Sequence, residues 1–316
     1  MIYFITVLRA LAACLITNAH YTGVYPTDII ANGGLIGDIL FFAVSGYCLY
    51  QIRDPFAAWY GKRLVRIYPP VWLFSVVCLG LGTYSLQNHG LLWWLMYPTY
   101  YHFVASIAVL YVVYYWVIRN QVLREHLPQV MCVAAGIYLI VYTFFYDKTY
   151  YHIDVVREPM IRFLFLESML LGAYFRQNDK KFRNRFSLRW VAAVIVAAGL
   201  YFASKIVFSR GQAYMYLQFL NQVTIFVLLY TLLRLFSGMD AMLERMPGLA
   251  KRIIEFVAAI TLEIYIVQYV LIDMIRPFFS FPVNWIAMTG SILLAAFALH
   301  MCDGMIRRGI NRIFRK

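Results

Sequence analysis

Residues 2–19 read IYFITVLRALAACLITNA, an apolar stretch with one charged side chain, Arg9. The roughly 30 Å hydrocarbon core of a bilayer is crossed by a helix of about 20 apolar residues, so this stretch predicts a membrane span. The stretch has no charged region before it of the kind that a secretory signal peptide carries. We therefore expect it to remain in the mature protein as the first span.

The same composition extends along the whole chain of 316 residues. Apolar residues make up 63% of it, charged residues 14%, and the mean hydropathy is +0.67. Ordinary soluble domains carry roughly 25% charged residues, which excludes a soluble globule and a disordered chain. We expect one membrane-embedded domain over residues 1–316, with room for about ten spans and no appended soluble domain.

Apolar runs separated by polar or Pro/Gly-containing breaks predict the individual spans. Their expected bounds are Ile2–Ala19, Leu35–Tyr50, Val71–Leu86, Phe103–Ile118, Val130–Tyr146, Phe163–Phe175, Trp190–Phe208, Leu217–Phe236, Ile253–Ile275 and Trp285–Met301. The run Leu91–Tyr101 is either an interfacial helix or part of the fourth span. The expected fold class is an all-α polytopic bundle of about ten transmembrane helices.

The chain is strongly basic, with 28 Lys and Arg residues against 15 Asp and Glu and a net charge of +13. In a soluble protein this balance would suggest nucleic acid as a partner. Here, however, the basic residues sort by loop, because 21 of them fall in alternate loops and the tail and 6 in the remaining loops. This asymmetry follows the positive-inside rule and predicts that both termini are cytoplasmic. We expect no nucleic-acid partner.

The cysteines give no sign of a metal site or a disulfide framework. The five, Cys14, Cys48, Cys78, Cys132 and Cys302, all fall in apolar runs without C-x-x-C spacing. We interpret them as reduced core residues and expect no bound metal.

Arg9 lies near the middle of the first predicted span, where a charge costs at least roughly 2.5–3.5 kcal/mol. Its guanidinium must therefore face the protein interior or water. His20 follows eleven residues later, within about 20° of the same helix face and about 16 Å further along the axis. Either the two residues line one polar stripe, or Arg9 closes an interhelical hydrogen-bond network and His20 only lies at the interface.

Arg63 and Arg66 precede the third predicted span and, three residues apart, share one helix face. Pro69 and Pro70 follow them and are expected to end or kink the segment where it meets lipid. Two guanidiniums suit a phosphate-bearing cytosolic ligand, because Arg binds phosphate with a bidentate fork. Positive-inside topology and anionic lipid headgroups explain the same two residues, so the spacing leaves both interpretations open.

Three short motifs follow one another along residues 9–72. They are Arg9-Ala10-Leu11-Ala12 with His20, then FFAVSGY at residues 41–47, then RLVRIYPPVW at residues 63–72. In this order they resemble the acyltransferase-3 family, multi-span membrane enzymes that O-acylate bacterial surface carbohydrates and other acceptors. The ten-span layout extends the resemblance loosely over the rest of the chain.

The resemblance implies a role for each of these residues. A cytosolic acyl-coenzyme A (acyl-CoA) would give its acyl group to an acceptor on the outer side of the membrane. His20 would be the catalytic imidazole and Arg9 its essential partner. Arg63 and Arg66 would engage the donor.

Ser45 and Gly46 are a small pair among bulky residues of the second predicted span. Small residues let helices approach closely, which explains the pair without any chemistry. The resemblance implies that they shape the core next to the first span.

Residues 261–268 read TLEIYIVQ and are similar to the family's late motif. In that motif Ser or Thr is followed by an aliphatic-Tyr segment that ends in His. Thr261 and Tyr265 match, whereas Gln268 stands where the His is common. A Gln side chain forms hydrogen bonds but does not titrate, so we assign Gln268 no proton transfer.

Two carboxylates fall inside predicted spans, Glu167 near the outer face and Glu263 within the late motif. An intramembrane carboxylate is a candidate functional group. A structural partnership with Arg9 is the alternative.

These observations predict a membrane O-acyltransferase, with acetyl as the default group, in the bacterial cytoplasmic membrane. An alcohol is a poor nucleophile unless its proton is removed, and His, with an unperturbed pKa of about 6.5, suits that task. We expect acyl-CoA as co-substrate and no permanently bound cofactor. The expected partners are membrane lipid and a carbohydrate or lipid-linked glycan acceptor, and the sequence leaves the oligomeric state open.

Two other classes of protein fit the composition. A secondary transporter also needs many spans and buried charges, but it usually carries inverted repeats and paired broken helices, and the sequence shows neither. A flippase-like subunit of a polysaccharide export system would tolerate substitution of Arg9 and His20.

Overall fold

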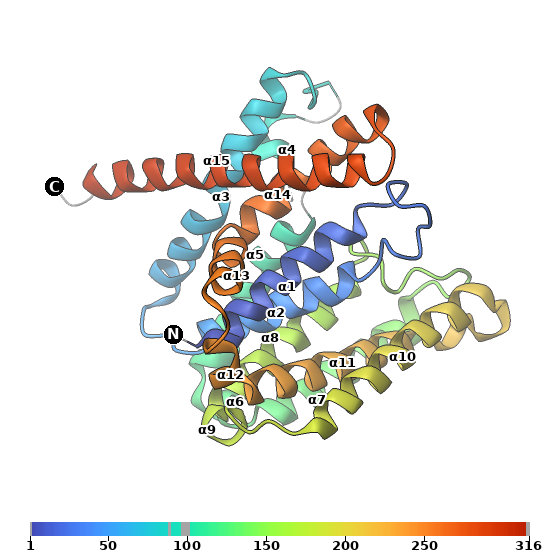
Figure 1. Ribbon diagram of the computed structural model, residues 1–316. Coiled ribbons are helices and arrows are strands. Elements are labelled where there is room, and N and C mark those ends of the chain that lie inside the picture. The colour runs from blue at the N-terminus through green and yellow to red at the C-terminus, as the bar shows by residue number, and fades with distance from the viewer. Residues whose placement is uncertain (1, 88–89, 96–101, 314–316) are drawn as a thin grey trace.

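The computed structural model describes residues 2–87, 90–95 and 102–313, and all regular elements in these ranges are helical (Figure 1). The helices are α1 (Tyr3–Ala19), α2 (Gly34–Leu49), α3 (Phe56–Gly80), α4 (Leu91–Leu95), α5 (His102–Arg119), α6 (Gln121–Glu125), α7 (Leu127–Phe145), α8 (Ile161–Gln177), α9 (Asp179–Phe182), α10 (Leu188–Arg210), η1 (Gln212–Leu217), α11 (Phe219–Gly238), α12 (Asp240–Glu244), α13 (Gly248–Ala259), α14 (Thr261–Ile275), η2 (Arg276–Phe278) and α15 (Val283–Ile313). The predicted all-α class is confirmed. The run Leu91–Tyr101 begins with the separate helix α4, and its last six residues lie outside the described ranges.

Among the described residues, six helices are long and apolar enough to cross a membrane, namely α3, α5, α7, α10, α11 and α15. The helices α1 and α2 are apolar but shorter, and α13 and α14 pass the same test only as a bent pair. These helices are those of a multi-pass membrane protein. The count of ten spans and the cytoplasmic position of the termini stay predictions.

The predicted continuous span Ile253–Ile275 is wrong, because the chain bends by 74° between α13 and α14. At Ile260 the backbone leaves the helical region, with φ −104° and ψ 19°. The hydroxyl of Thr261 donates to the carbonyl oxygens of Val257 and Ala258, both at 3.1 Å. The side chain therefore provides hydrogen bonds to carbonyl oxygens at the point where the backbone hydrogen bonds of the helix are interrupted.

α3 begins at Phe56, well before the predicted start at Val71, and continues through Pro69 and Pro70 to Gly80. Of the two expected outcomes, an end or a kink, an end at the prolines is wrong. A proline has a φ compatible with a helix and removes one backbone donor, so the pair removes two hydrogen bonds from a helix of 25 residues. The basic turn and the apolar turns therefore belong to one helix.

The core is formed where α2 crosses α8, and glycines allow the close approach. A Cβ atom on Gly46 would fall on the backbone of Met169, and one on Gly172 would fall on the backbone of Ala43. The interpretation that small residues let these helices approach closely is therefore confirmed for Gly46.

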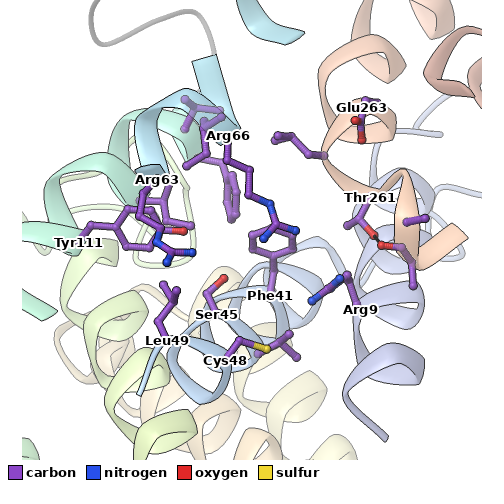
Figure 2. A pocket seen from close by; sticks show the side chains of 18 of the residues that line it. Arg9, Phe41, Ser45, Cys48, Leu49, Arg63, Arg66, Tyr111, Thr261 and Glu263 are labelled. Carbon is purple, nitrogen blue, oxygen red and sulfur yellow. Dashed lines mark hydrogen bonds between the residues drawn. The ribbon is translucent and has the colours of Figure 1, made fainter. Parts of the chain in front are cut away.

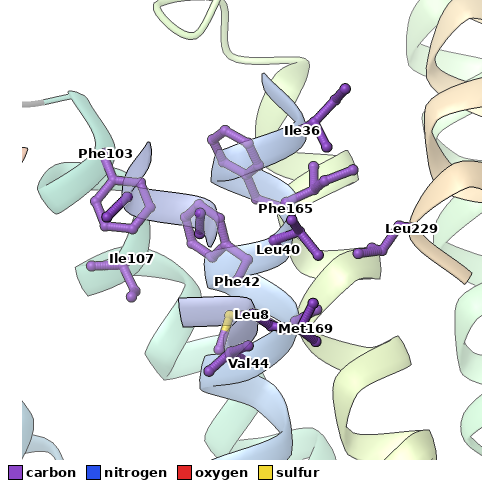
Figure 3. Close-up of a cluster of buried hydrophobic side chains, with 14 of the residues drawn as sticks. Leu8, Ile36, Leu40, Phe42, Val44, Phe103, Ile107, Phe165, Met169 and Leu229 are labelled. Carbon is purple, nitrogen blue, oxygen red and sulfur yellow. The ribbon is translucent and has the colours of Figure 1, made fainter. Parts of the chain in front are cut away.

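Aromatic side chains fill the space beside this crossing (Figure 3). The ring of Phe42 on α2 stacks on Phe165 of α8, with centroids 4.3 Å apart, and lies 4.9 Å from Phe103 of α5. Leu8 of α1 is fully buried in the same cluster. The first, second, fifth and eighth helices thus share one core.

α1 packs against α2, α13 and α14, and a side chain of α12 binds its first turn. The backbone N–H of Phe4 donates to Oδ1 of the buried Asp240 at 2.8 Å, which satisfies a helix-terminal donor. α15 packs against α14 and α3 and crosses the other helices in Figure 1. These contacts bring α1, α3, α14 and α15 around one region.

All five cysteines are free. Cys78 is buried and Cys302 is half-buried, whereas Cys132 is exposed on its helix, and Cys14 and Cys48 are exposed toward cavities of the bundle. The interpretation as core residues is therefore wrong for those three. A thiol behaves as a small apolar group, so its place in an apolar run does not distinguish a core position from an outward one.

Candidate functional site

One cavity brings together the three arginines that the sequence singled out. It lies between α1, α2, α3, α5, α14 and α15 and holds about 980 Å³ of empty space, counted with its open mouth. Arg9 comes from α1, and Arg63 and Arg66 come from α3. Figure 2 shows all three side chains pointing into the same space, which we call the arginine cavity.

The arginine cavity carries excess positive charge. The guanidinium of Arg63 lies over the ring of Trp59 at 5.6 Å, and its buried Nε has no hydrogen-bond partner among the described residues. The carboxylate that lines the cavity belongs to Glu263. Several guanidiniums around one open space form a site for an anion, and a forked donor matches phosphate oxygens best.

Glu263 binds His300 and not Arg9. Nδ1 of His300 lies 2.8 Å from Oε1 of Glu263, and both residues line the arginine cavity. The sequence left open whether this carboxylate is a partner of Arg9, and the structure gives it a different one. Sequence reasoning missed His300, although a histidine inside the predicted span Trp285–Met301 is itself an intramembrane ionisable group.

A second, narrower cavity adjoins the first along α1. The two share the lining residues Phe41, Phe103, Thr261 and Leu262. On α1 the narrow cavity is lined by Ala13 and Ile16, which at 100° per residue lie within about 40° of the Arg9 face. Its far end is lined by Gln268. The polar stripe predicted from Arg9 is therefore apolar along this middle stretch.

His20 lies at the C-terminal end of α1, outside both cavities. Its ring meets Tyr269 edge-on, with centroids 6.2 Å apart. One turn earlier, the hydroxyl of Thr17 donates to Oε1 of Gln268 at 2.7 Å and ties α1 to α14. Desolvation by neighbouring side chains lowers the pKa of His20, and the carboxylate of Asp273 opposes this shift.

Ser45 and Gly46 differ in what they do. Ser45 lines the arginine cavity. Gly46 faces α8, and its carbonyl oxygen accepts a 2.6 Å hydrogen bond from the hydroxyl of Tyr114. The motif thus supplies one cavity side chain and one packing contact.

Two further predicted residues lie on different sides of the bundle. The hydroxyl of Tyr265 accepts a 3.3 Å hydrogen bond from the backbone N–H of Phe103 and lines the narrow cavity. Glu167 lies on α8, and its buried Oε1 has no hydrogen-bond partner within the described ranges. Glu167 lines neither the arginine cavity nor the narrow cavity.

A third cavity, of about 920 Å³ with its open side, lies between α1, α14 and α15. Its walls are largely apolar, and hydroxyl groups gather beyond the end of α1. Tyr21 shares a 2.8 Å hydrogen bond with Thr289, and the hydroxyl of Tyr25 donates to Asn18 at 2.7 Å. The cavity extends from Ala13, which also lines the narrow cavity, around α1 to Asn18, which is turned about 180° from Arg9.

A family model described as an acyltransferase domain, Acyl_transf_3, matches residues 2–301. The chain belongs to the acyltransferase-3 family. No curated protein and no solved structure gave a match. The resemblance inferred from the motifs is confirmed and covers nearly the whole chain.

In this acyltransferase the motif residues form two groups. Arg9, Arg63 and Arg66 meet in the arginine cavity. His20 lies apart from them, about 16 Å along α1 from Arg9. The narrow cavity lies beside the stretch of α1 that joins the two groups.

Proposed function

We propose that this membrane acyltransferase moves an acyl group, acetyl by default, from cytosolic acyl-CoA to a hydroxyl of an exported carbohydrate. The observation that carries the proposal is the convergence of Arg9, Arg63 and Arg66 on one cavity. Topology alone explains basic residues at a membrane surface, but it does not require three guanidiniums from two helices to face a common space.

The arginine cavity suits the phosphate-bearing end of the donor. Coenzyme A carries a diphosphate and a further phosphate, and guanidiniums bind such groups through paired charge-assisted hydrogen bonds. The unpartnered Nε of Arg63 is a donor that such a ligand can satisfy. In the positive-inside orientation that we expect, this cavity would open toward the cytoplasm.

We assign the pantetheine arm to the path of the narrow cavity, whose empty volume of about 270 Å³ must widen to admit it. An extended arm is on the order of half of the roughly 30 Å hydrocarbon thickness. This length matches the separation of about 16 Å between Arg9 and His20 along α1. With its phosphates on the arginines, the donor therefore presents its thioester near His20.

His20 acts on the acceptor in this proposal. The neutral imidazole takes the proton of the acceptor hydroxyl as its oxygen attacks the thioester carbonyl. The C–S bond breaks, an O-acyl ester forms, and the thiolate of coenzyme A takes up the proton from the imidazolium. A lowered pKa keeps the imidazole in the neutral form that this role requires.

The third cavity suits a lipid-linked glycan as acceptor. Its apolar walls between α1 and α15 match a hydrocarbon chain, and the hydroxyl groups of Tyr21 and Tyr25 lie where a sugar would meet the end of α1. The enzyme would then act in the bacterial cytoplasmic membrane, with the donor and acceptor bound to different faces of α1.

The bend between α13 and α14 is the feature that favours a transporter instead, since broken helices line the binding sites of secondary transporters. Such folds pair two broken helices in corresponding halves, and the described residues contain one bent pair. A purified transporter would move a solute into proteoliposomes without consuming acyl-CoA, whereas the enzyme consumes acyl-CoA in detergent.

Mass spectrometry of surface glycans from cells with and without this chain tests the proposal and identifies the acyl group and the acceptor. We expect the acyl group to be lost without the chain and with His20→Ala. The matched control is His126→Ala, because His126 is an exposed histidine between α6 and α7 whose ring contacts the carbonyl oxygen of Val122 and not α1 or α14. Full acylation by an inserted His20→Ala variant would overturn the proposed chemistry.

A further inference from the structure

The arginine cavity contains a hydrogen-bonded pair of side chains that the acyl-transfer scheme leaves unused. Glu263 on α14 and His300 on α15 line the same cavity as Arg9, Arg63 and Arg66. The Glu263 side chain is 4% exposed, whereas that of His300 is 42% exposed. The carboxylate is therefore enclosed, and the imidazole lies between it and the open space.

We propose that His300, held in place by Glu263, is a fourth phosphate-binding group of the donor site. This inference rests on the proposed acyl-CoA donor. For this role the ligand must carry a phosphate group that contacts His300, a side chain outside the arginine motifs.

The hydrogen bond between the two residues fixes which imidazole atom the ligand can reach. Nδ1 of His300 is directed at Oε1 of Glu263 at 2.8 Å. The remaining ring nitrogen, Nε2, is thus the polar atom left for the cavity. A protonated imidazole donates a hydrogen bond from each nitrogen, so the ring can bridge the buried carboxylate and a phosphate oxygen.

The surrounding charges agree with this assignment. Arg9 of α1 and the two arginines of α3 are the cations of the cavity. On α15 itself, one turn beyond His300, the buried Asp303 is the next acidic side chain. Glu263 supplies a carboxylate on one side of the His300 ring, and a bound phosphate would supply a second anion on the other side.

The position of the pair excludes a direct part in the acyl step. Glu263 precedes Gln268 by five residues on α14, which is about 8 Å along the helix. Gln268 marks the end of the narrow cavity where the thioester is expected, and His20 lies beyond it. The pair therefore belongs to the phosphate end of the donor.

The test uses two donors that differ only in their phosphates, acetyl-CoA and S-acetyl-pantetheine, with the full chain in lipid nanodiscs. Coenzyme A binding is measured by calorimetry, and kcat and KM are measured for both donors. We expect His300→Gln to raise the Kd for coenzyme A and the KM for acetyl-CoA by about 10- to 100-fold. Transfer from S-acetyl-pantetheine should be unchanged.

Three further variants separate binding from a structural role. His300→Lys restores a cation and should recover part of the coenzyme A affinity. Glu263→Gln should weaken binding like His300→Gln, and the double variant should lose little more, because both changes act on one group. His126→Gln, at an exposed histidine outside the cavity, should match the wild type.

Two results would overturn the inference and leave the proposed function intact. One is wild-type affinity for coenzyme A in His300→Gln. The other is an equal loss of transfer from both donors, which indicates a structural defect. If the wild-type protein itself fails to bind coenzyme A, the proposed function fails, and this inference fails with it.

Discussion

The hydroxyl of Thr17 donates a 2.7 Å hydrogen bond to the side-chain oxygen of Gln268 and so joins α1 to α14 one turn before His20. Thr17 lines the third cavity, and Gln268 lines the narrow cavity. The pair therefore stands between the proposed paths of the acceptor and the donor. Gln268 occupies the position where relatives often carry a histidine, and its use here is to accept a hydrogen bond.

Thr17→Val should lower kcat by about 10-fold and leave the KM for acyl-CoA nearly unchanged. Valine keeps the shape of threonine but loses the hydroxyl, so the end of α1 and His20 are positioned less well, while the arginine cavity is untouched. Steady-state kinetics with acyl-CoA measure the separate changes in kcat and KM. Thr17→Ser keeps the hydroxyl that donates the hydrogen bond and should retain activity. Equal activity of the Val and Ser variants would contradict this role.

Arg66→Ala should raise the KM for acyl-CoA by about 10- to 100-fold with a smaller change in kcat. The loss of one charge-assisted contact to a phosphate weakens donor binding more than the chemical step. The control is Arg53→Ala, which removes an exposed basic residue just before α3. If donor kinetics are the same in both variants, Arg66 serves topology alone.

The pH profile of kcat/KM should keep its acid limb below the ordinary histidine pKa of about 6.5, because desolvation lowers the pKa of His20. The imidazole of His20 then stays neutral down to a lower pH. Asp273→Asn removes the carboxylate that opposes this shift, so the acid limb should move to still lower pH. A limb that does not move, or moves upward, would contradict His20 as the base. Asp147→Asn, in a distant loop, is the control.

Hydropathy predicted most of the helices, and motif order predicted the residues that we propose for the chemistry, since both are local properties of the chain. Arg9 stands out because a charge in an apolar run must have a partner or a solvent, whereas Arg63 and Arg66 stand out through their shared helix face and the motif around them. That they meet in one cavity depends on how α1 packs near α3, and this packing is not encoded within either motif.

Three features could not be predicted from the sequence. Ile260 is an apolar residue inside an apolar run, so nothing local distinguishes the bend at that position from a continuous span. The basic first half of α3 falls outside any window of high hydropathy, which placed the start of the span at Val71. The pairing of Glu263 with His300 joins two helices and has no sequence signature.

Gly46→Ala should destabilise the protein by at least about 1–3 kcal/mol, because the added methyl group overlaps the backbone of Met169 and forces α2 away from α8. Thermal unfolding in detergent, followed by size-exclusion chromatography, measures the effect. Gly199→Ala in α10 is the matched control, since a Cβ there meets no atom within 4 Å. The control should be neutral or stabilised by up to about 1 kcal/mol, because glycine is the poorer helix former. Equal stability of the two variants would show that α2 and α8 do not depend on this contact.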